Sequence, residues 1–589
     1  MNLLFDIEAN GLDPTEIFCI VAVDIDTGKV YSFDNTELGH GYNFLRMADK
    51  LVGHNIIGYD LPAIKKVANL DLTDWDTKIV DTLVLSRLFK PTREGGHGLE
   101  SWGYRLGFNK GTYGQSEGAW EAYNPEMLEY CRNDVLLNLK VYNALKVESK
   151  GFTAQAVRLE HEVAKIINQQ KLNGFVIDQK LAMTLVAQFE EKLADIEAEV
   201  QQVFKPKVAI QYIKAKYTKS GAIAKTGVDQ FGKGVRLKAD EWTELSQFPT
   251  KTLSRENVTE FNLGSRKQIG EYLIDFGWKP KNYTPTGQPI VDEGTLSRIK
   301  DIPEAQLIAE YLMVQKRLAQ VNSWMKEMSE DGRVHGYVNP NGAVTGRMTH
   351  SHPNMAQVPS SNSPYGKECR SCWTVPNKHK LVGIDASGLE LRMLASYMND
   401  EEYTNEILNG DIHTFNQKLG GLESRNQAKT FIYALLYGAG DAKLGQVVGR
   451  GREHGKKLRE QFLYNLPSFK ALTSSVQRKA KAGYVKGLDG RKLTVRSEHA
   501  ALNTLLQGAG AIVMKQALVI LNNTIEENKL RAKFVANVHD EWQIECHSDD
   551  ADEVGKAGVH AIVRAGEMLN LKCPLDGEYQ VGLNWSETH

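Results

Sequence analysis

Apolar residues gather along this chain in short runs, separated by longer stretches in which they recur every three to four positions. Short runs predict buried strands, and the longer stretches predict amphipathic helices. The strands are expected at residues 2–5, 381–384, 534–538 and 542–546. A helix is expected from residue 126 onward, because Asn124 and Pro125 are good helix-start residues. The mixture predicts a multidomain protein of the α/β and α+β classes.

Two acidic residues stand where C-terminal strands end. Asp385 directly follows the strand 381–384, and Asp540 lies in the three-residue turn between the last two strands. Carboxylate oxygens suit Mg²⁺, and two such groups can hold a pair of ions about 3.5–4 Å apart. The pair predicts a nucleotidyl-transfer site. The simpler alternative is that each acid is a solvated turn residue.

A helix on which cationic and then aromatic side chains follow one another is expected between these two acids. Residues 425–440 (RNQAKTFIYALLYGAG) place two cations and then two tyrosines at successive steps of four, on one helical face: Arg425, Lys429, Tyr433 and Tyr437. The cations can bind a triphosphate, and the rings can pack against sugar and base. An ordinary amphipathic helix would explain the apolar residues of the other face, but not this order.

These segments, with IDASGLELR (384–392) and VHDE (538–541), resemble the A, B and C motifs of family A DNA polymerases. The amino-acid sequences of these segments are similar to those of phage replicative polymerases of the thioredoxin-recruiting (podovirus) kind. The resemblance implies that Asp385, the Ala386 carbonyl and Asp540 bind two Mg²⁺ ions, which Mn²⁺ can replace. It implies catalytic roles for Asp385, Asp540 and Lys429.

The resemblance also assigns residues to substrate binding. It implies that the incoming dNTP is bound by His413, Arg425, Lys429, Tyr433, Glu390 and Tyr437. Glu390, bonded to Tyr437, would exclude a ribose 2′-hydroxyl, and Tyr at position 433 is associated with acceptance of dideoxynucleotides. The residues that resemble DNA-binding positions are Arg347, Gln357, Asn503, Gln507 and His539. Minor-groove acceptors are degenerate between base pairs, which suits an enzyme that checks pair shape without choosing sequence.

A second set of acids lies near the N-terminus. Asp6 and Glu8 are two apart after the first strand, so an extended chain puts both on one face. Asp60 follows the apolar stretch 51–57, and Tyr130 and Asp134, four apart, share a face of the helix from 126. This set predicts a two-metal hydrolytic site, with Tyr130 and Glu8 suited to orient water.

The three acidic segments resemble the motifs of the DnaQ-like (RNase H-like) 3′–5′ exonuclease superfamily. The resemblance implies catalytic roles for Asp6, Glu8 and Tyr130 and metal binding, two Mg²⁺ ions, by Asp6, Glu8, Asp60 and Asp134. The fold expected from both resemblances is an exonuclease domain followed by a right-hand polymerase of palm, fingers and thumb.

Bulk properties limit the possible classes. The 589 residues suggest three or four compact units, and a net charge of −2 means that any DNA contact must come from local basic surfaces. No leader or apolar run of eighteen is found, so a cytoplasmic protein, in a bacterial host if phage-encoded, with no membrane partner is expected. The six scattered cysteines predict free thiols, and the CxxC at 369–372 lacks further zinc ligands.

Motif positions and composition predict the domain limits. They are an exonuclease domain at 1–150, a thumb with entry helices at 151–337, a palm at 338–400 and 481–589, and fingers at 401–480. A basic, flexible insertion interrupts the thumb at 204–260, because nine cations stand against one acid between 205 and 238. In the resembled enzymes such an insertion binds host thioredoxin. Its charge alone predicts a grip on DNA phosphates, with a solvated charged loop as the alternative.

The function expected is template-directed DNA replication with 3′–5′ proofreading, using primer-template DNA, dNTPs and Mg²⁺. A helicase-primase and a single-strand DNA-binding protein are the further partners of such an enzyme. The alternatives are a repair or organelle-type polymerase of the same family, an exonuclease whose C-terminal half is a DNA-binding scaffold, and a non-catalytic binding module.

Overall fold

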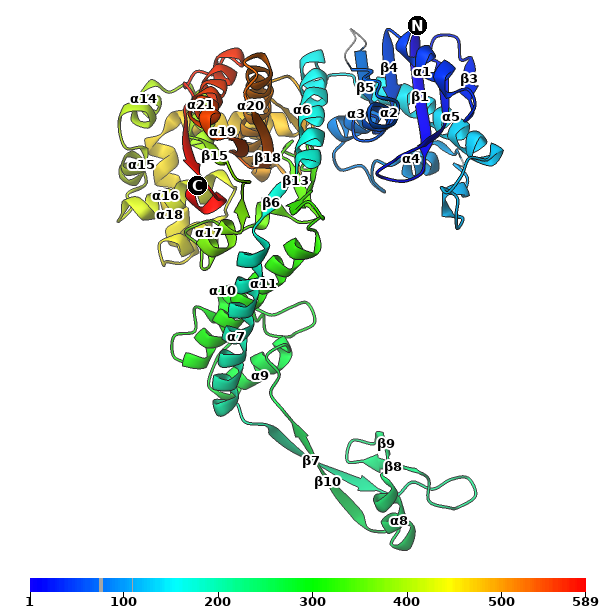
Figure 1. The fold of residues 1–589 in the computed structure, drawn as a ribbon. Coiled ribbons are helices and arrows are strands. Elements are labelled where there is room, and N and C mark those ends of the chain that lie inside the picture. Colours follow the sequence, from blue (N-terminus) through cyan, green and yellow to red (C-terminus); the bar gives the residue numbers. More distant parts are fainter. Residues whose placement is uncertain (74–77, 109) are drawn as a thin grey trace. The chain divides into compact units, whose positions relative to one another are not determined.

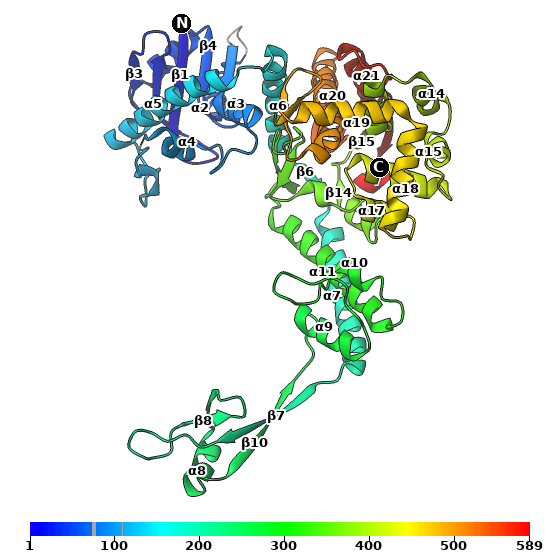
Figure 2. The ribbon, with the colours of Figure 1, turned by 180° about the vertical axis from the view of Figure 1, so that it is seen from behind.

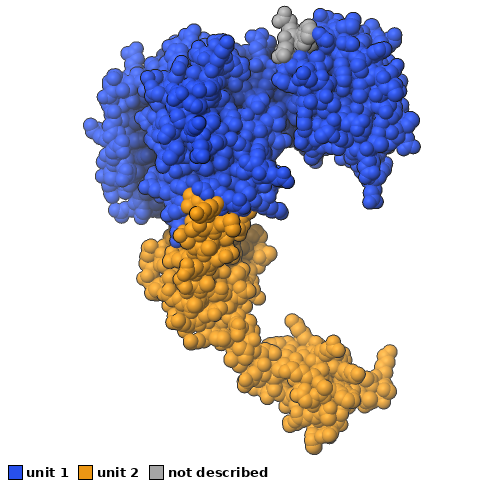
Figure 3. All heavy atoms as spheres, viewed as in Figure 1, with its two compact units in different colours: residues 1–179, 324–589 blue, residues 180–323 orange. Residues whose placement is uncertain are grey.

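The chain forms two compact units in a computed structural model that describes residues 1–73, 78–108 and 110–589. The first unit joins Met1–Gln179 to Trp324–His589, and the second is Lys180–Ser323 (Figure 3). The second unit is narrower than the range 151–337 expected for the thumb and its entry helices. The reason is that α6 (Ala154–Asn173) packs on α20 (Ala501–Glu527) and β18 (Ala532–Val538), inside the first unit.

The N-terminal lobe of the first unit is a five-stranded mixed sheet with helices on both faces (Figure 1). Its strand order is β3-β2-β1-β4-β5, with β4 and β5 parallel to β1, and β2 and β3 antiparallel to their neighbours. The strands are β1 (Asn2–Ala9), β2 (Ile17–Asp24), β3 (Val30–Phe33), β4 (Lys50–Gly53) and β5 (Lys78–Asp81). The helices are α1 (Leu38–Arg46), α2 (Asp60–Ala68), α3 (Thr82–Phe89), α4 (Leu99–Leu106) and α5 (Pro125–Glu148).

Alternation along β1 decides which side chains face which helices. Leu3, Phe5 and Ile7 pack into a core with α1 and α2, whereas Leu4 packs into the core with α3, α4 and α5. Asp6 and Glu8 share the parity of Leu4 and therefore face α5, which Figure 2 shows crossing the sheet. The helix α5 begins as predicted, since the Asn124 side chain accepts a hydrogen bond from the Met127 backbone N–H.

The C-terminal sheet is antiparallel throughout, in the order β18-β19-β15-β20. The strands β15 (His379–Ala386), β18 and β19 (Glu541–His547) cover the three predicted C-terminal strands, and β20 is Gly577–Gly582. The helices α13 (Leu389–Met398), α20 and α21 (Ala551–Met568) contribute to its core. The segment Glu498–Glu527, which contains α20, is long and apolar enough to cross a membrane, but 72% of its most apolar window is buried inside the protein.

A helical lobe adjoins this sheet and shares its core. Its members are α14 (Glu401–Asn409), α15 (Ile412–Gly420), α16 (Arg425–Leu436), α17 (Asp441–Val447), α18 (Arg452–Asn465) and α19 (Pro467–Ala480). Shorter elements complete the unit: β6 (Phe175–Ile177), β11 (Arg333–Val334), β12 (Tyr337–Asn339), β13 (Thr349–Ser351), α12 (Gly366–Ser371), β14 (Trp373–Thr374), β16 (Tyr484–Lys486) and β17 (Lys492–Thr494). The 3-10 turns are η1 (Tyr113–Gln115), η2 (Met355–Gln357), η3 (Glu498–Ala500), η4 (Ser548–Asp550) and η5 (Trp585–Glu587). All six cysteines are free and buried, as predicted.

The second unit contains the basic insertion, and the insertion is folded. Its strands pair in the order β10-β7-β8-β9, and α8 packs Leu245 with Ile213, Leu237 and Leu253 in a small separate core. The predicted flexibility is therefore wrong, because Gly221 and Gly232 lie in turns between paired strands and Gly227 and Gly234 lie in β8 and β9 themselves. The elements of the unit are α7 (Gln179–Val203), β7 (Lys207–Lys214), β8 (Thr226–Asp229), β9 (Gly234–Arg236), α8 (Ala239–Gln247), β10 (Thr252–Thr259), α9 (Arg266–Asp275), α10 (Glu293–Leu296) and α11 (Pro303–Lys326).

Candidate functional site

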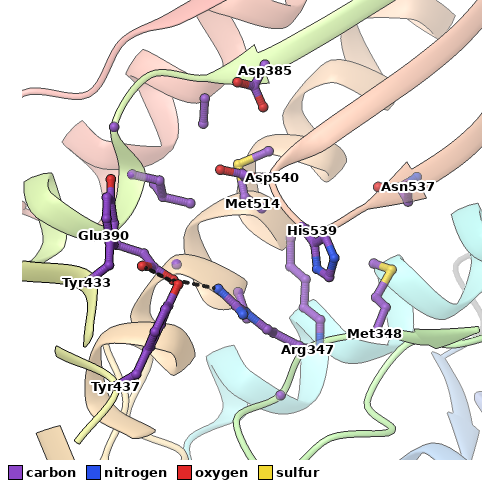
Figure 4. Close-up of a pocket in the computed structure, with 17 residues that line it drawn as sticks. Arg347, Met348, Asp385, Glu390, Tyr433, Tyr437, Met514, Asn537, His539 and Asp540 are labelled. Carbon is purple, nitrogen blue, oxygen red and sulfur yellow. Dashed lines mark hydrogen bonds and ion pairs between the residues drawn. The ribbon is translucent and has the colours of Figure 1, made fainter. Parts of the chain in front are cut away.

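Backbone pairing brings the two C-terminal acids together. Asp385 lies opposite Glu541 in the β15–β19 ladder, and the Ala386 N–H donates to the Asp540 carbonyl at 3.1 Å. The turn between β18 and β19 holds His539 at φ +57°, a left-handed conformation that side chains seldom adopt. Both carboxylates line one cavity of about 440 Å³, which we call the C-terminal cavity (Figure 4). Ala386 also lines it, next to both acids.

The electrostatics of this pair favour a bound cation. Burial, and then the charge of Asp540, raise the pKa of Asp385 to about 7, and burial also raises the pKa of Asp540. Two desolvated carboxylates side by side are costly in the ionised form unless a positive charge compensates them. Their oxygens are the donors that Mg²⁺ prefers, so the residues present fit a divalent ion.

A hydrogen-bonded group closes another side of the C-terminal cavity. The Tyr437 hydroxyl donates to Glu390 at 2.8 Å, and Arg347 Nη2 donates to the same carboxylate at 3.0 Å (Figure 4). Tyr433 lies beside Tyr437 with stacked rings, 6.4 Å between centroids, and also lines the cavity. Glu390 is thus held from two directions, and the Glu390–Tyr437 bond that the resemblance implies is present.

The remaining residues expected to bind dNTP lie outside the cavity lining, Arg425 and Lys429 on α16 and His413 on α15. The helix ends at Leu436, so Tyr437 is its cap residue and not its last turn. Arg425 is paired with Asp411, Nε to Oδ2 at 2.7 Å, and Lys429 is exposed. The His413 ring lies 6.3 Å from that of Tyr433. A face of cations therefore continues outward from the tyrosines of the cavity.

The residues expected to bind DNA lie in three places. Arg347 and His539 line the C-terminal cavity. Asn503 and Gln507 do not, but they precede Ala511 on α20 at steps of four, and Ala511 does line it. Gln357 ends η2 and is exposed, outside the residues of the cavity wall.

The N-terminal acids form a second site, on the α5 face of the first sheet. Asp60 accepts a hydrogen bond from the Ile7 N–H at 3.2 Å, which ties the start of α2 to β1. Cys131 of α5 lies against Asp6, with Sγ 3.8 Å from Oδ2, and ligand atoms of Asp6, Glu8 and Cys131 all lie within 4.8 Å of one another. We call Asp6, Glu8, Asp60 and Asp134 the N-terminal acid cluster.

The N-terminal acid cluster also fits cations. Burial, followed by the neighbouring carboxylates, raises the pKa of Asp6 well above its usual value, and burial raises the pKa of Asp60 to about 7. Glu8 Oε1 and Asp134 Oδ1 are buried and accept no hydrogen bond from any residue that the structure describes. Carboxylate oxygens that are buried without a partner are costly, and a divalent ion would satisfy them.

Lys110 is a member of this site that sequence reasoning missed. Its Nζ lies 2.9 Å from Asp134 Oδ2 and 5.1 Å from the centroid of the Tyr130 ring, and it also bonds to the Tyr130 hydroxyl. Burial opposes the charge of Lys110, but the charge of Asp134 and the hydrogen bonds to Tyr130 and Asp134 together outweigh it and raise the pKa of the ammonium. The lysine stands in an irregular polar segment with no periodic pattern, so nothing in the sequence marks it.

Comparison with known proteins identifies the family. The sequence pattern of DNA polymerase family A matches residues 236–587, more than half of the chain. The chain is also 37% identical to the DNA-directed DNA polymerase of Enterobacteria phage T3 and 36% identical to that of Escherichia phage T7, each over the full length of both chains. This chain belongs to DNA polymerase family A. As a family A enzyme it is a metal-dependent DNA-directed DNA polymerase, and the similarity to the phage-type members extends over its whole length.

The fold agrees with that of a solved family A structure. A structure described as the POL domain of Pol1 from M. smegmatis, in complex with DNA primer-template and dNTP, superposes with a TM-score of 0.77 at 18% identity. The match covers 100% of this chain and 95% of that one. The expected polymerase fold and the resemblance to phage replicative members of family A are therefore confirmed.

We expect Mg²⁺ to stabilise this family A polymerase against heat at lower concentrations at pH 8 than at pH 6. The folded-state pKa values of Asp60 and Asp385, about 7, exceed the ordinary value of 3.8, so without metal these groups reduce stability as pH rises through 7. At pH 6 a metal must displace protons from them. The half-saturating Mg²⁺ concentration, read from melting temperatures, should fall at least about tenfold between pH 6 and pH 8. Equal values at both pH values would contradict this assignment.

Proposed function

We propose that the C-terminal cavity is the polymerase active site, where a primer 3′-hydroxyl attacks the α-phosphate of a dNTP. The observation that carries this proposal is the meeting of Asp385 and Asp540 in one cavity with Glu390, Tyr433 and Tyr437. The carboxylates come from distant parts of the chain, and antiparallel pairing of β15 with β19 is what joins them. The direct test is extension of a primed template in the presence of all four dNTPs and Mg²⁺.

Each group of the site has a distinct task in this reaction. Asp385, Asp540 and the Ala386 carbonyl would hold two Mg²⁺ ions, which lower the pKa of the attacking hydroxyl and neutralise the leaving pyrophosphate. Lys429 and Arg425 of α16, with His413 of α15, bind the triphosphate. Tyr433 packs against the sugar. Arg347, Gln357, Asn503, Gln507 and His539 hold the primer-template duplex.

Glu390 is proposed to exclude ribonucleotides. Tyr437 and Arg347 fix its carboxylate, so a rotamer change of Glu390 cannot relieve a clash with a ribose 2′-hydroxyl. Glu390→Ala should raise the ratio of ribonucleotide to deoxyribonucleotide incorporation, compared as kcat/KM, by about 10- to 100-fold. Tyr437→Phe keeps the carboxylate but removes one of its two anchors, so a smaller increase is expected. An unchanged ratio in Glu390→Ala would remove this role.

Proofreading is proposed for the N-terminal acid cluster. The four carboxylates would hold two Mg²⁺ ions that activate water against the last phosphodiester of a frayed 3′ end. Tyr130 and Glu8 orient that water. Two buried carboxylate oxygens without partners support this use, because a purely structural lobe gains nothing from them.

The folded insertion, residues 204–260, is proposed to bind host thioredoxin and to increase processivity. Val208, Ile210 and Tyr212 alternate along β7, and Val208 lies opposite Val258 of β10; all four side chains are exposed. An apolar sheet face of this kind fits a protein partner, and the surrounding lysines fit DNA phosphates. Processivity on a long primed template, measured with and without thioredoxin at two salt concentrations, tests both. If thioredoxin leaves product length unchanged, that partner is excluded.

The setting proposed for this chemistry is the bacterial host cytoplasm, with a helicase-primase and a single-strand DNA-binding protein at the same fork. The relatives from phages T3 and T7 support this setting. The rival functions are a repair-type polymerase and a nuclease that uses the C-terminal half as a scaffold. Lesion bypass with low processivity would favour the first. Degradation without extension when dNTPs are present would favour the second.

A further inference from the structure

A second cavity, of about 120 Å³, lies where the N-terminal lobe meets α6 and β12. Its wall includes Arg87 of α3, Lys171 of α6, Tyr337 of β12 and Asn341, and we call it the junction cavity. The volume equals about four liquid waters and is well below the 300–1,000 Å³ typical of small-molecule sites. The junction cavity can therefore accept part of a nucleotide, such as one base or one sugar, but not a whole cofactor.

Two polar atoms of the wall are buried without a partner. Arg87 Nε, a donor from the N-terminal lobe, and Asn341 Oδ1, an acceptor from the segment after β12, have no hydrogen-bond partner among the residues described. Asn341 is only 6% exposed. Buried groups of this kind are normally satisfied, and here a donor and an acceptor line the same small space. A ligand that carries both kinds of group, as a nucleobase does, would satisfy the two together.

Cations and a ring stand together in the same wall. Arg87 Nη2 donates to the Tyr337 hydroxyl at 2.9 Å, and Lys171 Nζ lies 6.0 Å from the centroid of the Tyr337 ring. Tyr337 and Lys171 are exposed, and Lys171 forms no ion pair with any residue of the described ranges. An aromatic ring between two cations is the combination that binds single-stranded nucleic acid, through base stacking and phosphate contacts.

The junction cavity lies next to the C-terminal cavity. Gly346 lines the C-terminal cavity, and a Cβ at this glycine would lie 3.4 Å from Asn341 Oδ1. Glu160 lines the junction cavity and accepts a hydrogen bond at 2.7 Å from Lys515, which lines the C-terminal cavity. One layer of side chains therefore separates the two spaces.

The wall of the junction cavity includes Gly58, two residues before Asp60 of the N-terminal acid cluster. Burial, and then the positive charges of Lys110 and Arg87, lower the pKa of His54 to about 3. Both cations are thus close to this imidazole, and Lys110 in turn contacts Asp134. Arg87 and Lys110 therefore supply positive charge at the junction cavity and beside the acids, whereas His54, with its pKa of about 3, is uncharged at neutral pH.

We propose that the junction cavity binds the single-stranded 3′ end of DNA on its passage between the two active sites. Tyr337 stacks on a base, Arg87 and Lys171 contact its flanking phosphates, and Asn341 accepts a hydrogen bond from the nucleotide. This rests on the proposed proofreading function. It adds a surface that neither active site contains.

The proposal is tested by comparing the rate of mispair excision with the rates of single-strand degradation and of matched-primer extension. Arg87→Gln combined with Lys171→Gln should slow excision of a mispaired primer terminus about tenfold, because two phosphate contacts are lost. Degradation of free single strands and extension of matched primers should stay within about twofold of the parent. Lys165→Gln is the matched control, a lysine of the same helix that is paired with Glu162 instead. Unchanged mispair excision in the double variant would overturn the proposal, and so would an equal loss on free single strands.

Photo-crosslinking shows whether the mispaired primer end contacts the junction cavity directly. It thereby tests the alternative that the double variant only weakens the packing of the N-terminal lobe against α6 and β12. In the Asp6→Ala, Glu8→Ala double variant, a primer ending in mispaired 4-thiothymidine should crosslink to a peptide that contains Lys171 or Tyr337. Crosslinks found only elsewhere would overturn the proposal. If the parent protein does not degrade single-stranded DNA at all, the proofreading function fails instead, and a crosslink at Tyr337 would still be evidence of DNA in the junction cavity.

Discussion

Asp385→Asn lowers the rate of nucleotide incorporation by about 10³-fold, which corresponds to roughly 4 kcal/mol of barrier. Asparagine keeps the size of the side chain but removes the charge that a divalent ion needs beside Asp540. Because Asp385 lies in β15 with its backbone paired on both sides, the fold should be retained. Degradation of single-stranded DNA should remain, since the N-terminal acid cluster belongs to a different sheet.

Single-turnover extension by one nucleotide measures this effect, with melting temperature as the check on folding. Asp549→Asn is the matched control, because Asp549 is an exposed acid that pairs only with groups outside the cavity, Arg531 and His547. Synthesis by Asp385→Asn within tenfold of the parent would refute the assignment of this carboxylate to metal binding.

Asp6→Ala combined with Glu8→Ala abolishes 3′ degradation, a fall of at least about 10³-fold, and leaves incorporation intact. The two carboxylates project from one face of β1 into a space where Asp60 and Asp134 are already buried, and the charges of these two acids repel Asp6 and Glu8. Without the first pair, the remaining acids cannot hold two divalent ions. Removing the repulsion should also leave the lobe at least as stable as before.

Release of the terminal nucleotide from labelled single strands measures the loss. Asp13→Ala with Glu16→Ala is the matched control, since these acids lie in the exposed connection between β1 and β2. Residual degradation above about one per cent of the parent rate would mean that the N-terminal site has been misassigned. A parallel loss of incorporation would mean that the two activities share one site.

The two sites are built by the same device on unrelated sheets. In each, one strand carries acids near its end and elements from elsewhere in the chain supply the rest. These are β18 and β19 for the C-terminal cavity, and α2 and α5 for the N-terminal acid cluster. Burial then raises the pKa values of these acids, so each site has carboxylates whose negative charge is not fully compensated until a cation binds. Metal binding and the ionisation of these carboxylates are therefore coupled.

Local pattern was enough for the elements that carry the chemistry. The apolar run 381–384 and the pair around residues 539–541 predicted β15 and the β18–β19 hairpin, because a strand and a tight turn are decided by a few adjacent residues. The start of α5 followed from Asn124 and Pro125 in the same way. Motif wording then indicated the family, since residue types at fixed spacing reflect the chemistry directly.

Tertiary structure decided everything that depends on residues far apart in the chain. Lys110 beside Asp134, Glu160 bonded to Lys515, and the junction cavity with its unpartnered atoms Arg87 Nε and Asn341 Oδ1 leave no local trace. The same holds for the insertion, residues 204–260. Its lysines and glycines predicted a flexible segment, and only the pairing of β7 with β10 shows that it is folded. Short-range periodicity reports which face of an element is buried, but packing between elements decides which faces meet, and only packing brings opposite or like charges within reach of each other.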